Sequence, residues 1–188
     1  TLSAADKPVM VARAWRLAPV DLELPRSAPT TTAGPGLTLD ERARVPAPPE
    51  QGESQAFFET GHEVGYDTSM EFEFIEGGFG EPGPARVWTR MPRQVLAEKP
   101  VSPLQRVMVA VDSGSGISAM LDWRRYLFIN VDLTVHLVRE PVGEWICLDS
   151  VTLAGDDGIG LTDTAILDEH GPIGRGSQSL LVGKRPSA

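Results

Sequence analysis

The sequence is poor in the residues that build covalent and metal frameworks, and it is short of positive charge. Among its 188 residues there are one cysteine, Cys147, and three histidines. A single cysteine excludes an internal disulfide framework and a multi-cysteine zinc site, and three scattered histidines without paired spacing predict no metal site. Seventeen Lys and Arg against 26 Asp and Glu give a formal net charge of −9. This charge argues against a nucleic-acid backbone as the partner.

Long apolar runs and an export signal are also missing. No apolar run reaches the roughly 18 residues that cross a bilayer, and the first residues lack the charged-then-apolar pattern of a secretory signal. We therefore expect no membrane span and a cytoplasmic location. The apolar share of 41% and the charged share of 23% are those of a globular chain. The start at Thr1 rather than Met predicts a fragment or a processed product.

Proline is plentiful, and its placement divides the chain. Seven of the 16 prolines fall between Pro19 and Pro49. Because proline fixes φ and removes a backbone donor, we expect a connector with little regular structure over residues 19–55. Residues 8–17 alternate like a strand, which cannot bury a face alone. The predicted organisation is a strand segment in residues 1–18, the connector, and one domain over residues 56–188.

Within that domain the hydrophobic pattern changes between strand and helix periods. Two strands come first, a long helix follows, and four more strands complete the order. Ser102 before Pro103 predicts an N-cap, and apolar residues on most sides of the helix predict that it is buried. An antiparallel sheet wrapped around one helix covers both, which predicts an α+β fold. The predicted strands are Met70–Ile75, Ala85–Thr89, Leu127–Val138, Trp145–Leu153, Gly160–Asp168 and Ser177–Val182, and the helix is Ser102–Leu121.

Asp112 is the most informative single residue of this pattern. It follows a run of five apolar or small residues inside the predicted helix. A carboxylate beside a buried helix face is costly unless it is hydrogen-bonded, and proteins keep such groups mainly where the polarity serves a function. Gly114 and Gly116 weaken the helix and let a ligand or another backbone approach. The plain alternative is a partly exposed Asp on a kinked helix.

Three segments together resemble the acyl-CoA thioesterase II family, in particular an actinobacterial-looking, thioesterase-like branch of double-hotdog proteins. These segments read VAVDSGSG, LFINVDLTVHLVREPVGEW and GSQSLLV. The resemblance covers residues 56–185 as a second hotdog unit, in which a sheet wraps around a central helix. It also identifies residues 7–17 as the last strand of a first unit. Most of that first unit is then outside the chain.

The resemblance implies a site in which three side chains hold the water that attacks a thioester. In this family they are an Asp on the helix, a Thr or similar residue on the next strand, and a Gln on the last strand. Here these positions fall on Asp112, Asn130 and Gln178. Asn can hold a water as donor and acceptor but cannot act as a base, which leaves proton transfer to Asp112. Strand alternation places Asn130 on a polar face, so the strand must bend for it to meet Asp112, or that face must line a cleft between units.

The activity implied is hydrolysis of an acyl-CoA to a free acid and coenzyme A, without a metal or cofactor. A non-catalytic acyl-CoA-binding or assembly module of the same fold is the main alternative. A hotdog dehydratase or hydratase is a second one, although no His lies near Asp112 in the helix. We expect an oligomer in which residues 7–17 pair with a first hotdog unit on another polypeptide or on a missing N-terminal segment. A homodimer with exchanged strands is the alternative.

Other chemical groups are weaker candidates. Ser113 and Ser115 in DSGSG lack the G-x-S-x-G order of the hydrolase nucleophile elbow. Cys147 lies in an apolar strand without a base near it in sequence, which predicts a buried, inert thiol. Arg124 and Arg125 follow the helix, where they could meet the phosphates of coenzyme A or could simply be a cationic helix C-terminus.

Overall fold

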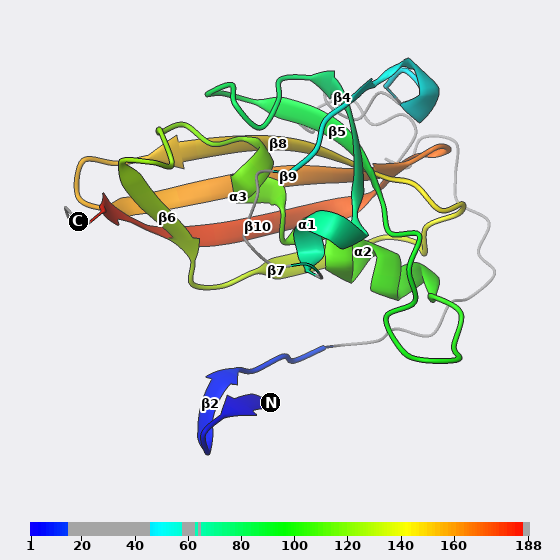
Figure 1. Ribbon diagram of the computed structural model, residues 1–188, viewed down its shortest axis with the longest axis horizontal. Helices are drawn as coiled ribbons and strands as arrows, with labels where there is room; N and C mark the ends of the chain where they lie inside the picture. Colours follow the sequence, from blue (N-terminus) through cyan, green and yellow to red (C-terminus); the bar gives the residue numbers. More distant parts are fainter. Residues whose placement is uncertain (15–45, 58–62, 64, 186–188) are drawn as a thin grey trace, which may run out of the picture.

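The computed structural model describes residues 1–14, 46–57, 63 and 65–185, and its main body is one antiparallel sheet with short helices against one face (Figure 1). The strand order is β3-β4-β5-β8-β9-β10-β6, and β7 also pairs with β10. The predicted α+β fold is confirmed. The strands are β3 (Glu53–Ser54), β4 (Glu71–Glu76), β5 (Ala85–Arg90), β6 (Tyr126–Asn130), β7 (Thr134–Leu137), β8 (Ile146–Ala154), β9 (Ile159–Asp168) and β10 (Gly171–Lys184). The helices are η1 (Pro49–Gln51), α1 (Tyr66–Ser69), α2 (Pro103–Val111) and α3 (Gly114–Ile117).

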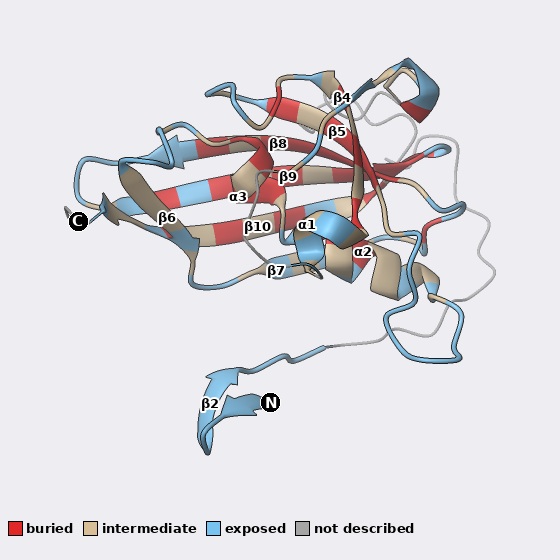
Figure 2. Cartoon of the chain, viewed as in Figure 1, coloured by how far each residue is buried: buried red, intermediate tan, exposed pale blue. Residues whose placement is uncertain are grey.

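The core lies between the sheet and the helices α2 and α3, which cover one of its faces. Figure 2 shows buried residues in the central strands and in these two helices. Val107 and Val111 of α2 and Ile117 of α3 are at most 1% exposed. A second cluster of Trp88, Cys147 and Leu167 packs on the opposite face. There burial raises the pKa of the Cys147 thiol well above its usual range, and the predicted burial of this thiol is confirmed. The indole of Trp88 donates to the carbonyl of Ala47 at 2.8 Å.

The single helix predicted over Ser102–Leu121 is wrong in its length, because the chain breaks it in two. Its start is as expected: Ser102 Oγ accepts from the N–H of Gln105 at 3.3 Å, and the Gln105 side chain accepts from the N–H of Ser102 at 2.9 Å. α2 then ends at Val111, and α3 begins at Gly114. Gly114 lies so close to the sheet that a Cβ on it would be 2.6 Å from Thr164 Oγ1. The glycine therefore lets α3 settle directly on the strands.

The strand predicted over Leu127–Val138 is also divided, into β6 and β7. Asn130 pairs with Leu180 and Thr134 pairs with Ser177, so four steps along this chain match three steps along β10. The one extra residue is a bulge that reverses which side chains face the core. Phe128 and Asn130 share the helix-facing side in β6, whereas Leu133, Val135 and Leu137 pack against the core around β7.

The N-terminal residues form a hairpin rather than the single strand predicted over residues 8–17. β1 (Leu2–Ala4) pairs antiparallel with β2 (Lys7–Met10), and the turn residues Ala5 and Asp6 have φ of 47° and 62°. Residues 1–14 are all exposed, and the hairpin lies apart from the main sheet in Figure 1. Residues 15–17 of the predicted strand lie outside the described residues.

The predicted connector is described only at its C-terminal end. Residues 19–45 lie outside the described residues, whereas Glu53–Ser54 form β3 and pair with β4. The last residues of the stretch 19–55 thus belong to the sheet. None of the described helices has the length and apolarity that a membrane crossing would need.

Candidate active site

The structure brings all three predicted site residues together. Asp112 follows the end of α2, Asn130 is the last residue of β6, and Gln178 lies in the middle of β10. Asn130 Nδ2 donates to Asp112 Oδ1 at 2.5 Å. Gln178 Nε2 donates to the Asp112 backbone carbonyl at 3.1 Å and to Oδ1 at 3.4 Å. Two amides from two different strands therefore hold one carboxylate oxygen.

Gln178 is the fixed part of this arrangement. It is 1% exposed, and its Oε1 accepts from the N–H of Ser115 at 3.1 Å. Its amide thus connects β10 to both sides of the break between α2 and α3. Because every polar atom of the buried amide is hydrogen-bonded, the side chain has one stable orientation.

Asp112 itself is exposed, and Asn130 is half-buried. Within the described part of the chain, the hydrogen bonds to this carboxylate reach Oδ1 only. Oδ2 is thereby left for a solvent molecule, while Oδ1 is anchored. A carboxylate held at one oxygen and open at the other can orient a water and accept a proton from it.

The bulge between β6 and β7 is what brings Asn130 to this place. Asp132 stabilises the bulge, because its Oδ1 accepts from the N–H of Ser179 at 2.8 Å and its Oδ2 from the Ser179 hydroxyl at 3.2 Å. The N–H of Val131 donates to the Ser179 carbonyl at 2.9 Å. Asn130 therefore meets Asp112 because the strand bends, which is the first of the two arrangements expected from the sequence.

Tyr66 is a neighbour of the site that the sequence patterns did not reveal. Its hydroxyl hydrogen-bonds to Ser113 Oγ, next to Asp112. Burial of the hydroxyl raises the pKa of Tyr66 to about 12; the bond to Ser113 opposes this rise, and the charge of Asp112 adds to it. A lone tyrosine in a segment without strand or helix periodicity carries no signal of this contact.

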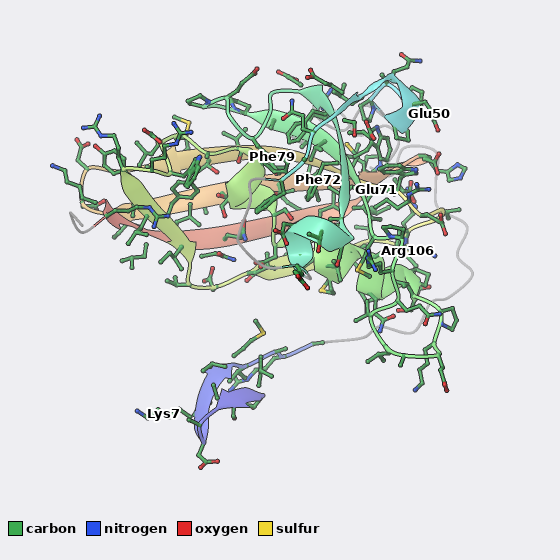
Figure 3. The ribbon with its side chains drawn as sticks, viewed as in Figure 1. Lys7, Glu50, Glu71, Phe72, Phe79 and Arg106 are labelled. Carbon is green, nitrogen blue, oxygen red and sulfur yellow. The ribbon has the colours of Figure 1, made fainter. Side chains whose placement is uncertain are left out.

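An aromatic cluster extends from Tyr66 along the β4 side of the site. Phe57 stacks on Phe72 with centroids 6.1 Å apart and meets the edge of Tyr66 at 6.2 Å. Phe79 lies 5.0 Å from both Phe57 and Phe72 (Phe72 and Phe79 are labelled in Figure 3). The rings provide an apolar surface beside the polar group at Asp112.

A row of buried hydroxyls fixes α3 on the sheet behind Asp112. Ser118 Oγ donates to the Gly114 carbonyl at 2.8 Å and lies 2.8 Å from Thr152 Oγ1, which lies 2.8 Å from Thr162 Oγ1. Because each hydroxyl is both donor and acceptor, the row is internally satisfied. These residues support the position of α3 and do not face the open side of Asp112.

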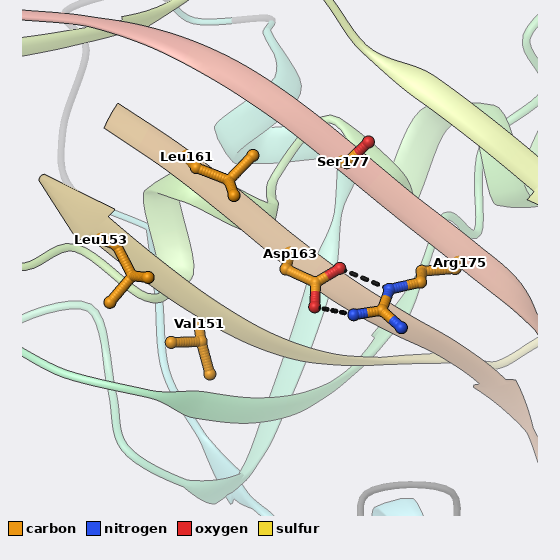
Figure 4. Close-up of a pocket in the computed structure, with 6 residues that line it drawn as sticks. All are labelled: Val151, Leu153, Leu161, Asp163, Arg175 and Ser177. Atoms are coloured by element: carbon orange, nitrogen blue, oxygen red, sulfur yellow. Dashed lines mark hydrogen bonds and ion pairs between the residues drawn. The ribbon is translucent and has the colours of Figure 1, made fainter. Parts of the chain in front are cut away.

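A hollow on the other face of the sheet is separate from this site. It measures about 500 Å³ and contains the ion pair of Asp163 and Arg175, whose Nε donates at 2.5 Å (Figure 4). Ser177 lines this hollow, whereas the adjacent residue Gln178 points to Asp112, because successive side chains of a strand face opposite sides. No group of three or more His, Cys, Asp or Glu among the described residues is arranged to hold a metal ion.

Comparison with solved structures finds the same fold in another protein. A "putative thioesterase II" from Thermobifida fusca superposes with a TM-score of 0.58 at 19% identity, over 82% of this chain and 58% of its own length. An acyl-CoA thioesterase II from Mycobacterium marinum aligns at 15% identity with a TM-score of 0.44, over 72% of this chain and 57% of its own. The chain thus spans little more than half of either protein. None of the curated proteins compared with the chain matches it.

The family follows from the sequence itself. A model of the family described as acyl-CoA thioesterase C-terminal domain matches residues 40–182, about three quarters of the chain. The match includes the helix residue Asp112 and both strand residues that hold it, and it confirms the resemblance noted in the sequence. The chain therefore belongs to the acyl-CoA thioesterase C-terminal domain family.

Proposed function

We propose that the chain hydrolyses an acyl-CoA thioester to a free acid and coenzyme A, with Asp112 orienting and deprotonating the attacking water. The observation that carries this proposal is the Asp112 carboxylate, held at Oδ1 by Asn130 and Gln178 and open at Oδ2. Membership of a thioesterase family supports the reaction class. A thioester is an activated acyl group, so one positioned water and one base are sufficient chemistry.

The proposed step begins with a water hydrogen-bonded to Asp112 Oδ2. Its proton passes to the carboxylate as its oxygen bonds to the thioester carbonyl carbon, which forms a tetrahedral intermediate. The carbon–sulfur bond then breaks, and the proton passes from Asp112 to the leaving thiolate. Gln178 acts as a positioning residue, since its amide contacts the carboxylate rather than the reacting atoms, and Asn130 holds the same carboxylate oxygen.

The oxyanion of the intermediate requires a hydrogen-bond donor. Asn130 Nδ2 carries two hydrogens, and its one hydrogen bond within the described chain is to Asp112. The second hydrogen could be donated to an oxyanion formed beside Oδ2. An Asn at this position could then serve both the base and the intermediate, in a way that the hydroxyl of a Thr, with its single hydrogen, could not.

The partner proposed for this unit is a first hotdog unit, on another polypeptide or on a segment outside the chain. β6 has β10 on one side, and its other edge is unpaired within the described residues. That edge ends at Asn130, so a strand added there would border the site. An oligomer assembled in this way would complete the cleft for the acyl chain.

The test is release of free thiol from acyl-CoAs of graded chain length, together with a binding measurement on the same samples. We expect release by the wild-type chain, and a loss of at least about a hundredfold in kcat in Asp112→Asn, which keeps the shape and removes the base. Glu169→Gln, an exposed carboxylate in the β9–β10 turn, is the matched control and should keep the wild-type rate. Wild-type activity in Asp112→Asn would overturn the mechanism, and binding without release by the wild-type chain would favour the non-catalytic module.

The dehydratase alternative is less favoured by the placement of the described histidines. His136 pairs with Arg175 in the register of β7 and β10, on the face away from Asp112. His170 lies in the β9–β10 turn, where its N–H donates to Asp168 at 2.8 Å. His62 lies outside the described residues. Neither of the two described imidazoles is beside Asp112 to form the acid–base pair that dehydration needs.

A further inference from the structure

Four cationic side chains gather where β6 begins and β10 ends. They are Arg124, Arg125, Lys184 and Arg185, all exposed in a chain whose net charge is −9. Lys184 pairs with Tyr126, and the N–H of Arg185 donates to the Arg125 carbonyl at 2.9 Å. Figure 1 shows this end of β10, near the C-terminus, beside the start of β6. The four residues are called the basic end of the sheet below.

The basic end differs from the other arginines in what it contacts. Arg86, Arg90 and Arg139 form ion pairs with carboxylates, whereas in the described chain no carboxylate oxygen lies within 4.0 Å of the four cations. The nearest acid in sequence, Asp122, uses Oδ1 to accept from the N–H of Arg124 at 2.9 Å. The cations therefore keep their charge available for an external anion.

An aromatic ring lies within the same cluster. Trp123 is 38% exposed, and the guanidinium of Arg124 lies 5.6 Å from the centroid of its ring. Arg185 Nε donates to the Trp123 carbonyl at 2.6 Å, which ties the end of β10 to this segment. Arginines beside an exposed indole match both parts of a nucleotide, because the cations bind phosphate and the ring stacks on a base.

The distance from the basic end to the candidate active site is set by β6. Asn130, Phe128 and Tyr126 alternate along one face of the strand, from the site to the pair with Lys184. Four strand steps span about 13 Å. The pantetheine arm of coenzyme A, about thirteen bonds from sulfur to the first phosphorus, has the length of about four extended residues, or roughly 15 Å. The extended pantetheine arm is therefore long enough to span β6 from Tyr126 to Asn130.

The face between the two ends is apolar. A small hollow there is lined by Met120, Leu121, Phe128, Thr152, Ala154, Leu180 and Val182. Phe128 and Val182 are half-buried and lie opposite each other in the register of β6 and β10. An extended arm can lie along this face of β6, with its methylene groups toward Phe128.

We propose that the basic end of the sheet and Trp123 bind the phosphorylated adenosine of coenzyme A, so that the pantetheine arm runs along β6 and brings the thioester to Asp112. This inference rests on the proposed thioesterase function. It identifies coenzyme A as the carrier that the site recognises, since a thioester that lacks the nucleotide would have no contact with the four cations. Recognition of the carrier and hydrolysis of the thioester are thus assigned to opposite ends of one strand.

The experiment compares one acyl group on two carriers, coenzyme A and pantetheine. We expect Arg124→Ala/Arg125→Ala to raise KM for the acyl-CoA at least tenfold, to leave kcat near the wild-type value, and to leave kcat/KM for acyl-pantetheine unchanged. The matched control is Arg93→Ala/Lys99→Ala, which removes two exposed cations between β5 and α2. It should leave the KM and kcat for both carriers unchanged. Thermal unfolding of each variant shows that the fold is kept.

Direct binding gives a readout that does not depend on turnover. Adenosine 3′,5′-bisphosphate should quench the fluorescence of Trp123, with an affinity that falls as salt is added, and Trp123→Phe should remove the quenching. Equal KM values for the two carriers in the wild-type chain, or an unchanged KM in the Arg124/Arg125 variant, would overturn the proposal while leaving the thioesterase function intact. Nucleotide binding without hydrolysis of either carrier would overturn the thioesterase function and leave the binding site in place.

Discussion

Asn130 Nδ2 lies 2.5 Å from Asp112 Oδ1, and this contact joins the end of β6 to the end of α2. The two residues are 18 positions apart, and each stands at a break: Asp112 where the helix divides, Asn130 where the strand bulges. The break between α2 and α3 and the bulge after β6 allow the side chains of Asp112 and Asn130 to meet. A continuous helix and a regular strand would keep them apart. The irregularities of the fold are therefore what assembles the candidate site.

Replacement of Asn130 tests what this contact contributes. Asn130→Ala removes the only side chain from β6 that holds the Asp112 carboxylate, so we expect kcat to fall at least about tenfold, as for loss of one hydrogen bond to a charged group. Asn130→Thr restores one donor of the type usual in the family but not the second hydrogen, so it should recover only part of the rate. Steady-state kinetics on one acyl-CoA measures both. A Thr variant as fast as the wild-type chain would show that the second hydrogen of the amide is not needed.

Gly114 provides a test of how closely α3 must sit on the sheet. A Cβ at this position would be 2.6 Å from Thr164 Oγ1 and 3.0 Å from Gln178 Oε1. Gly114→Ala should therefore lower the free energy of unfolding by about 1–3 kcal/mol and displace Gln178 from Asp112, with a matching loss of activity.

Gly116 is the control for this substitution, two residues further along the same helix. A Cβ on Gly116 would meet no atom of another segment within 4 Å, so Gly116→Ala should be neutral or stabilising by up to about 1 kcal/mol through helix propensity. Chemical denaturation of both variants gives the comparison. Equal stability of the two would mean that α3 can shift away from the strands at no cost.

The sequence was sufficient for most of the strand positions, because these depend on local patterns, and the three residues named from the family resemblance lie together in the structure. Strand and helix periods are local properties, so β4, β5, β8 and β9 lie within one or two residues of the predicted ranges. The breaks at Asp112 and at Val131 are not local. They depend on the fit of Gly114 against Thr164 and on the bonds between Asp132 and Ser179, which join segments far apart in sequence.

Tyr66 and Ser113 show what sequence reasoning missed. Their hydroxyls are hydrogen-bonded across 47 positions, and burial beside Asp112 raises the pKa of Tyr66 to about 12. A double-mutant cycle with Tyr66→Phe, Ser113→Ala and the double variant isolates the pair. We expect each single change to lower the free energy of unfolding by about 1 kcal/mol and the double change to cost little more than either. Additive losses would show that the two hydroxyls do not act together.

Asp168 and Arg139 predict how stability depends on pH. The Asp168 side chain is fully buried, and Arg139 donates to both of its oxygens, at 2.5 and 2.6 Å. Burial alone would raise the pKa of Asp168, but the bonds from Arg139 and from the N–H groups of Val142 and His170 outweigh it and hold the pKa below its usual range. Its contribution to stability is therefore complete above the unfolded-state pKa of about 3.9, and it is lost as the pH falls through the lower folded-state pKa.

Two substitutions that each remove one carboxylate charge compare the stability contribution of this buried ion pair with that of an exposed one. Asp168→Asn leaves Arg139 without its partner and should lower the free energy of unfolding at pH 7 by about 3–5 kcal/mol. It should also flatten the loss of stability in acid. Asp163→Asn breaks the pair with Arg175, in which the side chains are 37% and 44% exposed, and should cost less than about 1 kcal/mol. Denaturant unfolding at pH 7 and near pH 3 measures both, and an Asp168→Asn variant with the wild-type acid profile would contradict the assignment.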